Sequence, residues 1–154
     1  MPVKKNVLIA QSGGPSPVIN ASLLGAAEAA MARDDVFGEV YAAAHGIEGV
    51  LCEELINLSA QDKRELSLLK TTPSAGAVGT CRYKLRDENE EDYARILEVC
   101  RAHNIGYFFY IGGNDSMDTA AKVERLAREN GIELTVTGIP KEANFIKCFT
   151  NLCD

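Results

Sequence analysis

The sequence has no apolar run long enough to cross a lipid bilayer, for which a helix needs about 20 consecutive residues. Near its start only Val7 to Ala10 form an apolar run, which is too short for the core of a secretory signal peptide. Basic residues are in the minority, since 16 lysines and arginines stand against 22 aspartates and glutamates, for a net charge of −6. These absences argue against membrane and nucleic-acid partners, and we expect a cytoplasmic protein.

Cysteine pairs of the kind that bind zinc are also missing. The five cysteines are scattered between Cys52 and Cys153 without a Cys-x-x-Cys spacing, and His45 and His103 lie near no cysteine cluster. A zinc site or a disulfide framework is therefore not expected. The thiols are predicted to be reduced and structurally ordinary.

The residues that are present fit one globular domain. The 154 residues are 46% hydrophobic and 25% charged, which is ordinary for a single soluble core. Apolar and amphipathic periodicity predicts strands at 6–10, 40–44, 107–111 and 133–137, and helices at 18–31, 59–69, 89–103 and from after Ser116 to Glu129. The second of these helices begins with Ser59-Ala-Gln-Asp62, which fits a capping box. Residues 51–58 fit either a short strand or an irregular edge.

Alternation of strands and helices predicts βαβ units with right-handed crossovers. The expected fold class is therefore α/β, a Rossmann-like three-layer architecture with a mostly parallel sheet and helices on both faces. Ligands of such sheets bind outside the carboxyl ends of the strands. Three loops at strand ends, residues 12–17, 112–116 and 138–141, are expected to converge on one edge, and the last of them is expected to break its strand.

Two of these loops carry paired glycines. Gly13-Gly14 lies between a strand and a helix, where the backbone can approach a phosphate and the helix amino terminus offers free N–H donors. The loop 112–116 repeats this pattern and adds Asp115, a carboxylate that needs an intervening cation such as Mg²⁺ beside a phosphate. The alternatives are a tight turn without ligand and a helix cap formed by Asp115 or Ser116.

Four motifs resemble those of the phosphofructokinase family. Residues 12–21, Ser-Gly-Gly-Pro-Ser-Pro-Val-Ile-Asn-Ala, resemble the family's Ser-Gly-Gly-x-x-Pro-Gly-x-Asn-Ala loop. Residues 112–116, Gly-Gly-Asn-Asp-Ser, resemble its Gly-Gly-Asp-Gly-Ser loop. Gly-Thr-Cys-Arg at 79–82 is similar to Gly-Ser-x-Arg, and Gly-Ile-Pro-Lys at 138–141 is similar to the start of Gly-x-Pro-x-Thr-Ile-Asp-Asn-Asp. The order and approximate spacing of the motifs agree over residues 6–141.

The resemblance implies the first domain of the phosphofructokinase fold, here incomplete, with a phosphoryl-donor site and Mg²⁺. Asp115 stands where ATP-using members have glycine, and together with Lys141 it implies pyrophosphate as the donor. A side chain at 115 fills space that an α-phosphate needs, and a lysine neutralises the compact anion. Arg82 suits a phosphate because its planar fork pairs with phosphate oxygens, although a surface ion pair with the acidic stretch 87–92 is the alternative.

The resemblance implies that eight residues bind the phosphoryl donor: Gly13, Gly14, Arg82, Gly113, Asn114, Asp115, Ser116 and Lys141. It also implies that Asp115 is a metal ligand. Arg82 and Lys141 are the expected phosphate stabilisers. Asn114 replaces the aspartate that the family associates with magnesium.

The resemblance ends after Lys141. The family continues with Thr-Ile-Asp-Asn-Asp, whose first aspartate is the general base, whereas this chain reads Glu-Ala-Asn-Phe-Ile at 142–146. We therefore expect residues 1–141 to be the donor-binding part of a phosphofructokinase domain. Residues 142–154 are expected to be a divergent tail from truncation or a frameshift, so the chain alone is expected to have no catalytic base and no turnover.

The activity that the resemblance implies is a glycolytic one. Phosphate passes from pyrophosphate to fructose 6-phosphate and gives fructose 1,6-bisphosphate, in an enzyme expected to be a homo-oligomer. The alternatives are the ATP-dependent reaction and a non-catalytic phosphate-binding module or partner of complete subunits.

Overall fold

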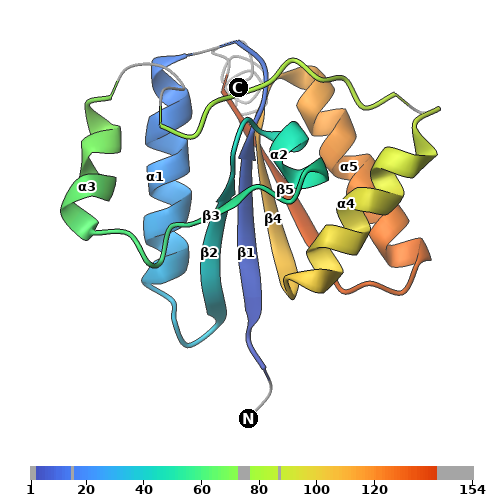
Figure 1. Cartoon of the computed structure of the whole chain (residues 1–154), viewed down its shortest axis with the longest axis horizontal. Helices are drawn as coiled ribbons and strands as arrows, with labels where there is room; N and C mark the ends of the chain where they lie inside the picture. Colours follow the sequence, from blue (N-terminus) through green and yellow to red (C-terminus); the bar gives the residue numbers. More distant parts are fainter. Residues whose placement is uncertain (1–2, 15, 73–76, 87, 142–154) are drawn as a thin grey trace, which may run out of the picture.

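The computed structural model describes residues 3–14, 16–72, 77–86 and 88–141 (Figure 1). The strands are β1 (Lys5–Gln11), β2 (Phe37–Ala43), β3 (Leu55–Asn57), β4 (Ile105–Gly112) and β5 (Thr135–Pro140). The helices are α1 (Pro17–Met31), α2 (Ile47–Leu51), α3 (Lys63–Ser67) with the 3₁₀ turn η1 (Leu68–Lys70), α4 (Glu90–Ala102) and α5 (Asn114–Glu129). The expected divergent tail, 142–154, lies outside the described residues.

The strands form one sheet in the order β3-β2-β1-β4-β5. All neighbouring strands are parallel except β3, which pairs antiparallel with β2. From β1 the chain passes through α1 to β2 on one side, whereas β4 lies on the other side of β1. The strand order therefore reverses between β1 and β4, and such a reversal is where ligands bind in open α/β sheets. The predicted mostly parallel sheet is confirmed.

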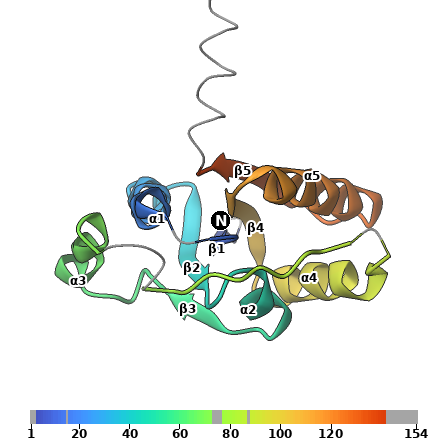
Figure 2. The ribbon, with the colours of Figure 1, turned by 90° about the horizontal axis from the view of Figure 1, so that it is seen from above.

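Helices cover both faces of the sheet, as predicted. Leu8 and Ala10 of β1 pack in the cluster that contains α2, α4 and α5, while Val7 and Ile9 pack in the cluster of α1 and η1. All four side chains are fully buried, because alternate residues of a strand point to opposite faces. Figures 1 and 2 show α1 and α3 on one side of the strands and α4 and α5 on the other.

The last strand is longer than expected. The interpretation of residues 138–141 as a strand break is wrong, since Gly138 to Pro140 pair with Tyr110 to Gly112 of β4. Pro140 is tolerated because β5 is an edge strand, where a missing N–H leaves no neighbour unsatisfied. This extension carries Lys141 to the same edge of the sheet as the end of β4.

The segment between β2 and η1 also differs from expectation. Helix α2 was not predicted, and residues 51–58 contain the short strand β3. The expected capping box is wrong, because the side chain of Asp62 caps α3, which begins only at Lys63. The hydroxyl of Ser59 instead accepts a hydrogen bond from the Val40 N–H at 2.9 Å.

The structure describes three of the five cysteines. Cys52, Cys81 and Cys100 are free thiols, and burial raises the pKa of Cys100 to about 12. None of the described helices combines the length and the apolar character that a bilayer crossing requires.

Candidate functional site

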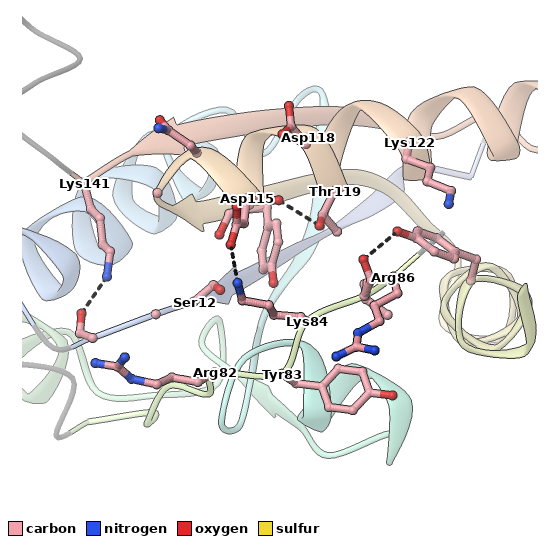
Figure 3. A pocket seen from close by; sticks show the side chains of 18 residues that line it. Ser12, Arg82, Tyr83, Lys84, Arg86, Asp115, Asp118, Thr119, Lys122 and Lys141 are labelled. Atoms are coloured by element: carbon pink, nitrogen blue, oxygen red, sulfur yellow. Dashed lines mark hydrogen bonds and ion pairs between the residues drawn. The ribbon is translucent and has the colours of Figure 1, made fainter. Parts of the chain in front are cut away.

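A cleft with a volume of about 640 Å³ opens at the carboxyl ends of β1, β4 and β5 (Figure 3). The three loops expected to converge all contribute to it, and so does the segment that follows residue 81. All eight residues predicted for the donor site line this cleft: Gly13, Gly14, Arg82, Gly113, Asn114, Asp115, Ser116 and Lys141. The predicted convergence is therefore confirmed.

Hydrogen bonds hold these loops in register. The Gly13 N–H donates to the carbonyl of Cys81 at 2.9 Å, and the hydroxyl of Thr80 donates to the carbonyl of Gly13 at 2.9 Å. The Lys141 N–H donates to the carbonyl of Gly112 at 3.1 Å. Figure 2 shows the segment 77–86 crossing above the strand ends, which explains how residues distant in sequence meet here.

Gly13 and Gly14 make room for two cations. Gly13 has a φ of +83°, and a Cβ at this position would lie 2.7 Å from the Nζ of Lys141. A Cβ on Gly14 would lie 3.2 Å from a guanidinium nitrogen of Arg82. The first glycine loop therefore lies directly beneath the ammonium and guanidinium groups of the cleft.

Replacing Gly13 with alanine is expected to destabilise the chain by about 1–2 kcal/mol, because a non-glycine residue is strained at positive φ. Gly25 is the matched control, since it lies inside α1 and a Cβ there meets no atom within 4 Å. Gly25→Ala is expected to stabilise by about 0.5–1 kcal/mol through helix propensity. Urea unfolding of both variants measures the difference, and equal effects would contradict the backbone strain expected at Gly13.

The start of α5 offers free donors to the cleft. Within the described residues, the backbone N–H groups of Asn114 and Asp115 donate to no protein acceptor, and the N-cap residue Gly113 makes no side-chain cap bond. Unsatisfied N–H groups and the helix dipole make such an end attractive to anions. The proposed capping role of Asp115 or Ser116 is therefore wrong.

The start of α1 is different from what the sequence suggested. Ser16 caps this helix, and it accepts hydrogen bonds from Val18 through its side chain and from Ile19 through its carbonyl. Pro17 has no N–H group. The expectation of free N–H donors at this helix end is therefore wrong for these positions, and the glycine loop contributes its closeness to Lys141 and Arg82 instead.

Cations outnumber carboxylates in the cleft although the protein has a net charge of −6. The charged lining residues are Arg82, Lys84, Arg86, Lys122 and Lys141, with the carboxylates Asp115 and Asp118. Figure 3 shows Arg82 and Lys141 at one end, Lys122 at the other, and Lys84 beside Asp115 between them. This distribution favours an extended or multiply charged anion.

Two lysine ammonium groups make contacts in the cleft, one at its end and one in its middle. The Nζ of Lys141 donates to the carbonyl of Gly14 at 2.6 Å. The Nζ of Lys84 lies 3.2 Å from a carboxylate oxygen of Asp115. Each ammonium group thus contacts an oxygen atom of the cleft wall. An anionic ligand in this cleft would lie near both lysines.

Asp92, the last residue of the acidic stretch considered as a partner of Arg82, binds the neighbouring Tyr83. The hydroxyl of Tyr83 donates to Asp92 at 2.5 Å, and this hydrogen bond raises the pKa of Tyr83. Arg82 lines the cleft. The geometry therefore favours a cleft-facing role over the surface ion pair.

Several lining residues were missed by the sequence analysis. Lys84 and Arg86 lie within four residues of the motif at 79–82, and Lys122 lies on the helical face of Asp115 and Asp118, so all three positions carried a usable signal. Tyr110 is buried, which raises its pKa to about 12, while hydrogen bonds with Ser12 and Ser116 act in the opposite direction.

A metal held by protein ligands alone is not indicated in the described part of the chain. No three or more His, Cys, Asp or Glu side chains there are grouped to hold a metal. The cleft carries the two carboxylates of Asp115 and Asp118. Mg²⁺ commonly uses one or two carboxylates and completes its coordination with water and substrate phosphates, so these residues fit a metal that arrives with its phosphate ligand.

Comparison with known proteins agrees with this geometry. The chain matches the family Phosphofructokinase over residues 6–144. It is 49% identical over 138 residues to the pyrophosphate–fructose 6-phosphate 1-phosphotransferase of Halomonas elongata, covering 88% of this chain and 33% of the relative. The protein of the same name from Methylococcus capsulatus is 46% identical over 151 residues, covering 97% of this chain and 36% of the relative.

Similar solved structures are also phosphofructokinases. The pyrophosphate-dependent phosphofructokinase of Marinobacter aquaeolei has a TM-score of 0.83 and 48% identity, with 90% of this chain and 33% of that chain covered. The Pichia pastoris phosphofructokinase, at 16% identity and a TM-score of 0.73, shares the fold alone. The chain spans about a third of the length of the curated relatives.

Proposed function

Because the chain belongs to the phosphofructokinase family, we propose that it forms the donor-binding part of a pyrophosphate-dependent phosphotransferase. The complete enzyme transfers a phosphoryl group from pyrophosphate to fructose 6-phosphate and yields fructose 1,6-bisphosphate. A glycolytic role in the cytoplasm and a homo-oligomeric assembly are part of the proposal. The curated relatives whose names state this reaction support it.

Asp115 and Lys141 line the same cleft, and this observation is the reason for proposing pyrophosphate rather than ATP as the donor. Lys141 supplies a point charge at the end where Gly13 and Gly14 let a compact anion approach the backbone. Asp115 occupies space beside the start of α5 that a longer nucleotide chain would need. Both features favour a small polyphosphate over a nucleoside triphosphate.

Four of the donor-site residues have direct roles toward the anion in this proposal. Arg82 pairs with phosphate oxygens through its fork, and Lys141 neutralises charge that develops on the leaving phosphate. The free N–H groups of Asn114 and Asp115 orient the anion at the start of α5. Phosphoryl transfer depends mostly on such positioning and electrostatic stabilisation, which is what these groups contribute to the donor half of the reaction.

Mg²⁺ belongs to the proposal as a cation shared between protein and pyrophosphate. Asp115 is its proposed ligand, and the amide oxygen of Asn114 can accept from a metal-bound water. Bound Mg²⁺ would offset the negative charge of the phosphate oxygens. Asp118, the second carboxylate of the cleft, is not required for this role.

Isothermal titration calorimetry of the 154-residue chain tests the donor site. We expect one pyrophosphate to bind per chain, more tightly with Mg²⁺ than with EDTA, and ATP to bind more weakly than pyrophosphate. Circular dichroism of the same sample establishes that the chain is folded. A folded chain that binds ATP but not pyrophosphate would favour the ATP-dependent reaction, and one that binds neither would contradict the proposal.

A further inference from the structure

Lys84 and Asp115 form an ion pair inside the proposed donor site (Figure 3). Lys84 comes from the extended segment after Cys81, and Asp115 comes from the first turn of α5. The Nζ and carboxylate oxygen are 3.2 Å apart, and the side chains are 73% and 77% exposed. The pair therefore bridges two walls of the cleft rather than parts of the core.

This pair has little value as a structural contact. Exposed ion pairs contribute almost nothing to folding stability, because water and salt screen them and two long side chains lose freedom. The backbone hydrogen bonds around Gly13 and Lys141 already hold the cleft walls together. The pair therefore adds little to folding, and it lies in the cleft where the proposed anion would bind.

A carboxylate in a pyrophosphate site creates an electrostatic problem. Asp115 repels the polyanion unless a cation stands close to its oxygens. Lys84 is the cation that the structure places there, with its Nζ 3.2 Å from a carboxylate oxygen of Asp115. Lys141 does not serve this purpose, since its Nζ rests on the carbonyl of Gly14.

We propose that Lys84 is a specificity-determining residue of the donor site that neutralises Asp115 and so admits pyrophosphate beside a carboxylate. This inference rests on the proposed function. Lys84 and Mg²⁺ then act on the same carboxylate, so the chain can bind pyrophosphate without metal. When Lys84 is absent, Mg²⁺ takes its place at Asp115, and binding comes to depend on the metal.

Calorimetry with pyrophosphate, in EDTA and in Mg²⁺, tests this on the folded chain. Lys84→Met is expected to weaken binding about tenfold in EDTA, the size of one partly solvated charge contact, and less in Mg²⁺. Lys84→Arg is expected to retain binding in EDTA because it keeps the charge. Lys63→Met, an exposed lysine of α3 outside the cleft, changes the net charge equally and is expected to bind like the wild type.

The Asp115→Asn background separates neutralisation from direct contact. Without the carboxylate, Lys84→Met is expected to change pyrophosphate affinity in EDTA only slightly. Mg²⁺ is then expected to restore no affinity to the Lys84→Met variant. An equal loss in both backgrounds would mean that Lys84 contacts the phosphate directly, and would overturn the proposal. Wild-type affinity in Lys84→Met would overturn it while leaving the proposed function intact, whereas a wild-type chain that binds no pyrophosphate overturns both.

Discussion

Replacement of Lys141 by alanine is expected to weaken pyrophosphate binding about 10- to 150-fold, which corresponds to the loss of one charged hydrogen bond of about 1.5–3 kcal/mol. Lys141 directly follows the edge strand β5, and its ammonium reaches over Gly13 to the Gly14 carbonyl. A compact anion that lies against this glycine loop loses its nearest point charge in the variant. Titration calorimetry with Mg²⁺ measures the change.

The effect should be confined to binding. The Nζ of Lys141 contributes to no part of the apolar core, so the urea midpoint is expected to stay close to that of the wild type. Lys63→Ala removes the same charge far from the cleft and is expected to leave pyrophosphate affinity unchanged. An unchanged affinity in Lys141→Ala would show that this end of the cleft does not bind the phosphate.

Replacement of Phe108 by alanine is expected to destabilise the chain by about 3–5 kcal/mol. Phe108 is fully buried in β4, and its ring centroid lies 5.6 Å from that of Tyr110. The substitution leaves a cavity between the sheet and its helical layer, and neighbouring side chains can fill only part of it. Since domains are stable by about 5–15 kcal/mol, this single change removes a large share of the total.

Urea unfolding followed by circular dichroism measures this loss. Leu68→Ala is the control, because Leu68 is 53% exposed, and its expected effect is below about 1 kcal/mol. Pyrophosphate is expected to raise the midpoint of Phe108→Ala, since a ligand of the native state stabilises by mass action. Equal losses in the two variants would contradict the assignment of β4 to the centre of the core.

The local pattern of the sequence determined the main strands and longer helices and the loops of the site, but not the short helix α2. Apolar runs such as Val7 to Ala10 can be buried only within a covered sheet, and the period of α4 was visible in its apolar residues. Gly13-Gly14 and residues 112–116 follow strands whose carboxyl ends must share an edge in a parallel sheet. Convergence of these loops is therefore a consequence of topology, and it could be predicted without coordinates.

Only the tertiary structure decided which side chains meet inside the cleft. Lys84 and Asp115 come from segments that no local period connects, and their pairing depends on how the segment 77–86 crosses the strand ends. The free amides of α5 and the satisfied amides at Ser16 depend on backbone hydrogen bonds that composition does not encode. Local periodicity specifies what each segment becomes, whereas contacts between distant segments depend on the register of the whole sheet and its loops.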